Sequence, residues 1–158
     1  MVGYSAYKLE AAMFYLRVVT GFIGLAMIAS ITYAGERVIN KSRVPIGQLS
    51  TVKTLKNPLP NTPATLVKGK IIYEQKGRCI LCHGVKGDGK GSAGVPPDPQ
   101  PSPRSFRNLE WQKIRTDGEL QWVISSGSHG SGMHSYDGIL TDEEIWQVVL
   151  YIRSFGHQ

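Results

Sequence analysis

The sequence predicts an all-α protein, in which an N-terminal helix that spans a membrane precedes one small helical domain. Two observations support this prediction. A run of seventeen uncharged, mainly apolar residues lies near the start of the chain. The second half contains segments in which apolar residues recur every three or four positions, which is the period of an α-helix. At 158 residues, the chain is long enough for one domain with accessory segments but not for two full-sized domains.

The membrane-spanning helix is predicted at about residues 13–34, within an N-terminal segment 1–34. No charged residue occurs between Val18 and Ala34, and the side chain of Arg17 can extend toward the membrane surface. A helix over residues 13–34 is roughly 33 Å long, which exceeds the bilayer core of about 30 Å. The alternative is a cleaved signal peptide, but its apolar region is usually only about 7–15 residues long. We therefore expect a retained, single-pass anchor in the lipid bilayer.

Residues 35–61 are predicted to be a linker. They contain scattered lysines and three prolines, and they lack a sustained apolar period. As a flexible coil, a linker of this length has a root-mean-square reach of about 25–30 Å. Its positive charges can contact anionic headgroups or an acidic partner, although simple solvation explains them equally well. We expect it to tether the domain, over residues 62–158, to the membrane.

The distribution of charge argues against a nucleic-acid-binding protein. The net charge is +6, but residues 1–65 hold seven basic and two acidic residues, which gives +5. Residues 66–158 hold eleven basic and ten acidic residues, which gives only +1. A nucleic-acid-binding domain concentrates its basic residues on the folded part that makes the contacts. The two cysteines also exclude a framework of several disulfides.

The first helix of the domain is predicted to begin at Pro63, because Thr62 can cap it and proline suits the first helical position. One face of this helix is marked by Leu66, Gly69, Ile72 and Tyr73. A second helix is predicted to begin at Asp117. The last helix follows a capping box formed by Thr141 and Glu144. Its apolar face carries Ile145, Val148, Val149, Ile152 and Phe155.

Between the first and second helices lies the motif C-x-x-C-H, formed by Cys79, Cys82 and His83. This is the attachment motif of a c-type haem. Two thiols at this spacing can add to the two vinyl groups at one edge of a porphyrin, and the histidine then lies under the ring as the fifth iron ligand. A thioredoxin-type redox pair would need a βαβ pattern, and a zinc site would need two further ligands. We expect one haem c, bound covalently through Cys79 and Cys82.

Met133 is the predicted sixth iron ligand. The other three methionines lie in or before the predicted membrane helix, and thioether ligation raises the reduction potential, which suits an electron carrier. Gly130 and Gly132 allow the tight loop that would bring the sulfur over the iron. The nearby His129 and His134 are the alternative ligands. Otherwise they are exposed residues of this loop.

Three residues are candidates for holding the haem propionates, namely Arg104, Arg115 and Trp111. A guanidinium group pairs with a carboxylate through two hydrogen bonds, which favours arginine for this task. We place Arg104 in the predicted cofactor site. An ordinary surface position explains each of the three residues as well.

Over residues 57–156, the chain resembles the small monohaem cytochromes c of class I, in which histidine and methionine bind the iron. The resemblance rests on the haem motif, the glycine-rich stretch after it, the Pro-x-Pro-Arg-x-Phe-like loop, the Asp-Gly-Glu-Leu helix start, the Gly-Met loop and the capped last helix. It implies a cytochrome c fold in which the first and last helices cross, with Gly69 letting the last helix approach near Tyr151. It also implies that His83 donates a hydrogen bond to a proline carbonyl in the loop that contains Pro96, Pro97, Pro99, Pro101 and Pro103.

The predicted function is the transfer of single electrons by a membrane-tethered cytochrome that has no substrate of its own and is not an enzyme. The expected donor is a quinol-oxidising membrane complex, and the expected acceptor is a terminal oxidase or a photosynthetic reaction centre. The alternative is a fixed haem-bearing subunit of a larger membrane oxidoreductase. A peroxidase-like haem enzyme or a gas sensor is less favoured, because it requires an open sixth position on the iron.

The expected location is the inner membrane of a bacterium, with the haem domain on the periplasmic side, because covalent haem attachment takes place on that side. The basic residues that follow the membrane helix favour the opposite orientation by the positive-inside rule. That rule is a statistical bias, so the chemistry of haem attachment takes precedence.

Overall fold

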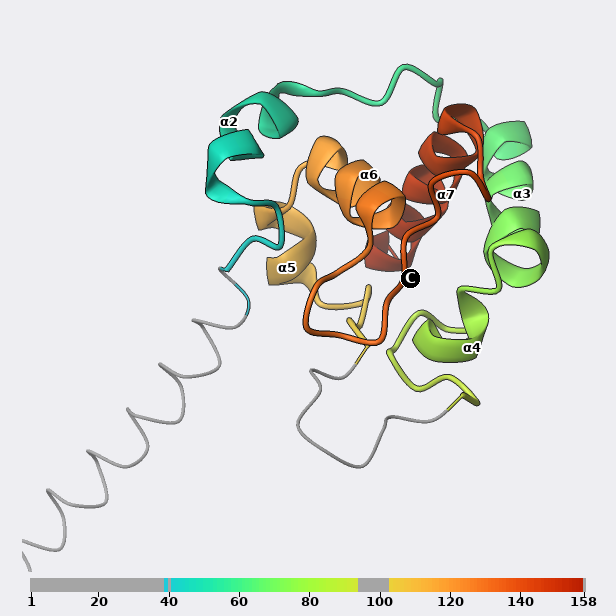
Figure 1. Cartoon of the computed structure of the whole chain (residues 1–158). Coiled ribbons are helices and arrows are strands. Elements are labelled where there is room, and N and C mark those ends of the chain that lie inside the picture. The colour runs from blue at the N-terminus through green and yellow to red at the C-terminus, as the bar shows by residue number, and fades with distance from the viewer. Residues whose placement is uncertain (1–38, 40, 94–102, 158) are drawn as a thin grey trace, which may run out of the picture. The chain divides into compact units, whose positions relative to one another are not determined.

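The computed structural model describes residues 39, 41–93 and 103–157, and in these ranges all regular elements are helices (Figure 1). The α-helices are α2 (Ile46–Thr54), α3 (Pro63–Ile71), α4 (Ile80–His83), α5 (Leu109–Ile114), α6 (Asp117–Ser126) and α7 (Asp142–Ser154). A π-helix, η1 (Ile72–Lys76), continues α3, and a short 3₁₀-helix, η2 (Phe155–His157), continues α7. The prediction of an all-α fold is confirmed for this part of the chain.

The predicted membrane-spanning helix, at about residues 13–34, lies outside the described residues. Within the described ranges, no helix is long and apolar enough to cross a membrane. Residues 42–158 form one compact unit. This unit begins about twenty residues before position 62, where the sequence analysis placed the start of the domain.

The predicted starts of the first and last helices of the domain are confirmed. The hydroxyl group of Thr62 accepts a hydrogen bond from an amide in the first turn of α3, where Pro63 occupies the first position. Thr141 and Glu144 form the predicted capping box of α7, with hydrogen bonds of 2.8 and 3.2 Å in the two directions. Local hydrogen bonds therefore fix where both helices begin.

Helices α3 and α7 lie side by side and pack against each other, and the buried Gly69 is at their contact (Figure 1). A Cβ atom placed on Gly69 would collide with the backbone carbonyl group of Gln147 and would lie 3.0 Å from Cβ of Tyr151. Glycine has no Cβ atom, so it allows the two helices to approach this closely. The role that the family resemblance gave to Gly69 is confirmed.

The core forms where α7 and η2 meet η1. The predicted apolar face of α7 and η2 is buried, since Ile145, Val148, Val149, Ile152 and Phe155 are each at most 4% exposed. Tyr73 of η1 is fully buried, and its ring lies 5.3 Å from that of Tyr151 and 5.6 Å from that of Phe155, measured between centroids. The ring of Phe106 extends this aromatic cluster toward Trp111 of α5. The cluster connects the crossing of α3 and α7 with the rest of the domain.

Residues 42–57, which we call the N-terminal strap, are not the flexible linker that the sequence analysis expected over 35–61. The strap contains α2, which packs against α6. Val44 and Val52 are buried, at 5% and 6% exposure. A Cβ atom placed on Gly118 of α6 would collide with the carbonyl oxygen of Val52, so the two backbones are in close contact. The expectation of flexible chain is therefore wrong for the strap.

Side-chain hydrogen bonds attach the strap at two further points. The indole nitrogen of Trp122 donates to Oε1 of Gln48 at 2.8 Å, and Nδ2 of Asn57 donates to the carbonyl oxygen of Trp146 at 2.9 Å. These partners come from α6 and α7, which follow the strap by more than 60 residues. The strap is ordered by contacts that are distant in sequence, and it shows no apolar period of its own. This explains why sequence analysis missed it.

The contact at Gly69 leads to a prediction about stability. Alanine is favoured over glycine inside a helix by about 1 kcal/mol, but at position 69 the added methyl group meets the backbone of Gln147. We expect Gly69→Ala to reduce the free energy of unfolding by about 2 kcal/mol or more. Chemical denaturation of the haem-loaded protein, followed by haem absorbance, measures this change.

The matched control is Gly47→Ala in α2, where an added Cβ atom would have no neighbour within 4 Å. We expect this variant to be as stable as the wild type, or to gain up to about 1 kcal/mol. Equal effects at positions 47 and 69 would contradict a close crossing of α3 and α7.

Candidate functional site

The two cysteines of the motif lie on one turn of helix. Cys79 is the N-cap of α4, Cys82 follows three residues later, and His83 ends the helix. Cys82 is exposed and Cys79 is half-buried. Burial raises the pKa of the Cys79 thiol to about 11, so this thiol is protonated at neutral pH. Because positions i and i+3 share a helix face, both sulfur atoms can reach one edge of a flat ligand.

Glycines leave room around α4. A Cβ atom placed on Gly77 would lie 3.1 Å from Sγ of Cys79, and one placed on Gly91 would collide with the carbonyl oxygen of Leu81. Gly84, directly after the motif, has a φ angle of 79°, which lies in the left-handed region that favours glycine. The glycine-rich stretch therefore lets the chain fold closely around the motif without side chains in the way.

His83 is held by one hydrogen bond and one ring contact. Its Nδ1 atom lies 3.1 Å from the backbone oxygen of Arg104, and its ring stacks on that of Phe106 at a centroid distance of 4.4 Å. A carbonyl oxygen only accepts hydrogen bonds, so Nδ1 donates its proton and Nε2 keeps the lone pair that a metal ion needs. Burial lowers the pKa of His83, while the bond to Arg104 opposes that shift. The imidazole is therefore neutral at neutral pH, as a ligand must be.

The hydrogen-bond acceptor of His83 is not a proline carbonyl, as the family resemblance had implied. Pro103 is the one candidate within the described ranges, and its carbonyl oxygen points at Gly89, where a Cβ atom would collide with it. The next residue, Arg104, supplies the acceptor instead. The amide of Phe106 donates to the carbonyl oxygen of Gly87 at 2.7 Å, which fixes this stretch of loop. The other four candidates, Pro96, Pro97, Pro99 and Pro101, lie outside the described residues.

Two buried tyrosines hold the chain on either side of the motif. The hydroxyl group of Tyr73 donates to the carbonyl oxygen of Gly84 at 2.8 Å, and that of Tyr136 donates to the carbonyl oxygen of Gly77 at 2.7 Å. Burial raises the pKa of both phenols, so both stay protonated and continue to donate. The sequence analysis placed Tyr73 on a helix face but assigned no role to Tyr136. Their partners are backbone carbonyl groups, which every residue has, so the sequence does not reveal these hydrogen bonds.

The loop that carries Met133 is attached next to the motif. Tyr136, three residues after Met133, makes the hydrogen bond to the segment before Cys79 that is described above. Within the loop, the amide of Ser128 donates to the carbonyl oxygen of Met133 at 3.0 Å, and the amide of Met133 donates to Oγ of Ser131 at 3.3 Å. These bonds hold Met133 in a tight loop, although its assignment as the sixth ligand stays a prediction.

The glycines of this loop differ in their roles. Gly130 has a φ angle of 71°, so its conformation favours glycine, as expected. Gly132 has no positive φ angle and no close neighbour, so the loop does not require glycine there. Gly127 is needed instead, with a φ angle of 79° and a Cβ position only 2.8 Å from the amide of Ser135.

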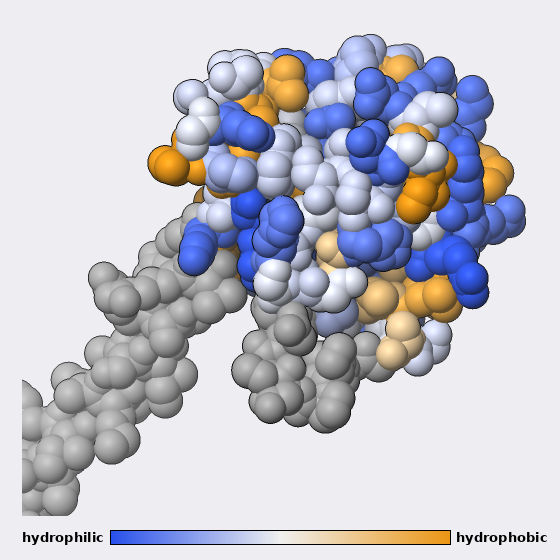
Figure 2. All heavy atoms as spheres, in the orientation of Figure 1, coloured by the Kyte–Doolittle hydropathy of each residue, from blue (hydrophilic) through white to orange (hydrophobic). Residues whose placement is uncertain are grey.

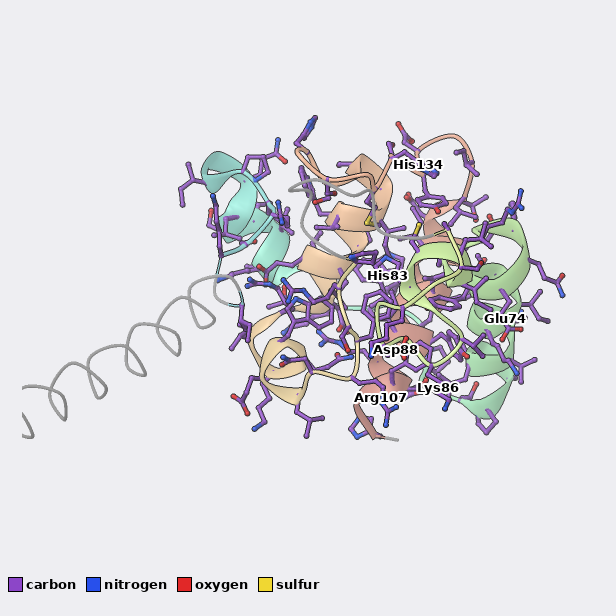
Figure 3. All side chains as sticks on the ribbon, turned by 90° about the horizontal axis from the view of Figure 1, so that it is seen from below. Glu74, His83, Lys86, Asp88, Arg107 and His134 are labelled. Atoms are coloured by element: carbon purple, nitrogen blue, oxygen red, sulfur yellow. The ribbon has the colours of Figure 1, made fainter. Side chains whose placement is uncertain are left out.

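The two alternative ligands, His129 and His134, are exposed. Figure 3 shows His134 near the rim of the domain, whereas His83 lies close to its centre. The ring of His134 packs against that of Tyr136 at a centroid distance of 4.6 Å.

The three candidates for holding propionates lie together. The guanidinium group of Arg104 lies over the ring of Trp111, 6.0 Å from its centroid. Nη1 of Arg115 lies 3.4 Å from Oε1 of Glu119, and these two side chains are only 9% and 1% exposed. Glu119 also closes the capping box at the start of α6 with Thr116. The structure thus gathers the predicted residues, while their role toward a haem stays a prediction.

These residues fit a covalently bound haem. Two thiols lie on one helical turn, the glycines around them leave space, and the adjacent imidazole has its Nε2 lone pair available. When a haem is bound, Cys79 and Cys82 would hold it and His83 would be an axial ligand. The arginines supply donors of the kind that its carboxylates need.

Known proteins resemble the chain over this region. The family model described as Cytochrome c matches residues 66–156. A solved chain of the reducing HAO-like protein complex of Kuenenia stuttgartiensis is similar to it, with 30% sequence identity and a TM-score of 0.53. The similarity covers 62% of this chain and 46% of that chain, so this protein spans about half the length of the solved chain. No curated protein matches.

Replacing the predicted sixth ligand tests the site. In Met133→Ala, we expect a lower midpoint potential, because thioether ligation stabilises reduced iron. The long-wavelength sulfur-to-iron absorption of the oxidised protein should disappear. Spectra and a potentiometric titration of the haem-loaded protein measure both effects.

His134→Ala, one residue further along the same loop, serves as the control and should keep the band and the potential. If the band survives in Met133→Ala and is lost in His134→Ala, the ligand assignment is wrong.

Proposed function

The chain belongs to the cytochrome c family, and we propose that it is a membrane-tethered carrier that passes single electrons between membrane complexes. A cytochrome c domain carries a covalent haem c and transfers electrons, and Cys79 and Cys82 have the spacing that attachment needs. Bound haem supplies the one-electron couple of its iron. The observation that carries the proposal is a methionine in a loop fixed beside the haem motif, because iron with both axial positions filled exchanges electrons without binding a substrate.

The residues around the site have separate tasks in this function. Arg104 and Phe106 hold the imidazole of His83 in one orientation. Tyr73 and Tyr136 fix the chain after and before the motif. Ligands that are held in place keep the same geometry in both oxidation states of the iron. Little structural rearrangement therefore accompanies the transfer of each electron.

The exposed edge of the site is the proposed route for electrons. The side chain of Cys82 is exposed, and Val85 nearby is 67% exposed. A hollow of about 360 Å³ lies beside them, lined in part by Ile80 and Leu81. Figure 2 shows hydrophobic residues on this side of the domain, around α4. An apolar edge suits brief contacts with partner proteins, since apolar contact needs no matched charges.

Membrane attachment, location and partners are parts of the proposal that rest on the sequence. The uncharged run at 18–34 supports an anchor, and haem attachment outside the inner membrane of a bacterium supports a periplasmic domain. Under this proposal, the donor is a quinol-oxidising complex and the acceptor is a terminal oxidase or a reaction centre.

One observation favours a fixed subunit of a larger membrane oxidoreductase as the second candidate. Because the strap packs on the domain, only residues 35–41 remain between the predicted membrane helix and the folded unit. Seven extended residues span at most about 25 Å, so the domain could not move far from its anchor to reach a partner. The similar solved chain also comes from a protein complex.

Truncation separates the two candidates. A protein without residues 1–41, exported by a cleavable signal, keeps the strap and the compact unit, so its haem spectrum and potential should not change. Electron flux in the membrane should fall severalfold at equal cytochrome content. The reason is that a short tether holds the domain near its membrane partners at an effective concentration of about millimolar, and the truncated protein loses this advantage. Haem reduction after addition of quinol measures the flux.

An excess of the truncated protein that restores the flux supports the carrier. A loss that no excess restores supports the fixed subunit, and undiminished flux would contradict a tether.

A further inference from the structure

Three arginines lie near α2 and α5, and the backbone of one of them, Arg104, also accepts a hydrogen bond from His83 at the end of α4. Arg43 comes from the strap, Arg104 from the loop before α5, and Arg115 from the turn between α5 and α6. The guanidinium group of Arg104 lies over the ring of Trp111, and the amide of Arg115 donates a hydrogen bond to the carbonyl oxygen of Trp111. Burial lowers the pKa of Arg104, and the positive charges of Arg115 and Arg43 lower it further. The sequence analysis considered Arg104 and Arg115 for the haem site. It left out Arg43, which fell in the predicted linker.

Arg43 is placed by its two neighbours in the chain. Oγ of Ser42 donates a hydrogen bond of 2.7 Å to Oε1 of Glu119, and Val44 is buried. The same oxygen of Glu119 lies 3.4 Å from Nη1 of Arg115. With both neighbours fixed to the domain, the backbone of Arg43 stays close to Glu119 and to Arg115, which is paired with Glu119.

The cluster carries unbalanced positive charge. Three guanidinium groups and the carboxylate of Glu119 give a net charge of +2. Asp117, which lies close by in sequence, is already bound by Nε of Arg153 at 2.7 Å. Arg104 and Arg115 are half-buried, whereas the side chain of Arg43 is exposed. Like charges held close together destabilise a fold unless anions join them. Two propionates, each with a charge of −1, would balance this cluster.

The chemistry of the haem directs its propionates to this side. The vinyl groups that react with Cys79 and Cys82 lie on one edge of the porphyrin, and the propionates lie on the opposite edge. With the vinyl edge at α4, the propionates point away from α4. Figures 1 and 3 show α2 and α5 on the side of the domain away from α4.

We propose that the N-terminal strap is part of the haem site, in which Arg43 joins Arg104 and Arg115 in binding the two haem propionates. This inference deepens the proposed function through its haem domain, and it does not depend on the membrane tether. A positive charge at the propionates disfavours the oxidised iron, which carries one more positive charge than the reduced iron. Arg43 therefore raises the reduction potential as well as holding the haem.

The test compares charge-removing variants of the full-length, haem-loaded protein in detergent. In Arg43→Gln, we expect the equilibrium constant for reduction to fall by up to about tenfold, which for one electron is a shift of about 59 mV to lower potential. Arg43→Lys keeps the charge and should recover most of the shift. Resonance Raman spectra of the propionate bending vibration should change in Arg43→Gln, because that vibration responds to hydrogen bonds at the carboxylates.

Lys53→Gln is the matched control, because it removes the same charge from an exposed position on the same strap. It should shift the equilibrium constant by less than twofold and leave the propionate vibration unchanged. Equal shifts in the two variants, or an unchanged propionate vibration in Arg43→Gln, would overturn the proposal. None of these results depends on membrane attachment, so a failure here is distinguishable from a failure of the proposed tether.

Discussion

The approach of α3 to α7 at Gly69 is the constraint on which the rest of the domain depends. Because no Cβ atom separates Gly69 from the backbone of Gln147, η1 continues α3 along the surface of α7 and places Tyr73 in the core. The hydroxyl group of Tyr73 then reaches the carbonyl oxygen of Gly84, which directly follows the haem motif. A helix crossing is in this way linked, through one buried side chain, to the position of His83, the predicted iron ligand.

His83 shows how backbone and side-chain contacts combine in the site. The carbonyl oxygen of Arg104 selects the tautomer, and the ring of Phe106 sets the plane of the imidazole. Phe106 belongs to the same aromatic cluster as Tyr73 and Phe155. The imidazole of His83 is therefore supported by the core itself, and a change in core packing would change its orientation.

Sequence reasoning succeeded where the signal is local and failed where contacts are distant. Each of these signals depends only on residues close together in sequence: the helix caps at Thr62 and Thr141, and the spacing of Cys79 and Cys82. The structure confirms both caps. The strap could not be predicted, because the backbone of Val52 lies against Gly118 of α6, 66 residues further along the chain. The acceptor of His83 is Arg104 and none of the described candidate prolines, because every residue has a carbonyl group and the fold decides which one faces the imidazole. Helix α5, with only six residues, is too short for its period to be read.

The strap also determines how the domain would respond to mechanical force. If the chain is held at its N-terminus, a pull reaches Ser42 and Val44 first, and these residues are fixed to the domain by Glu119 and by burial. The contact between α2 and α6 then carries the load. The hydrogen bond between Ser42 and Glu119 and the packing of α2 on α6 would therefore be loaded before the contacts that hold His83.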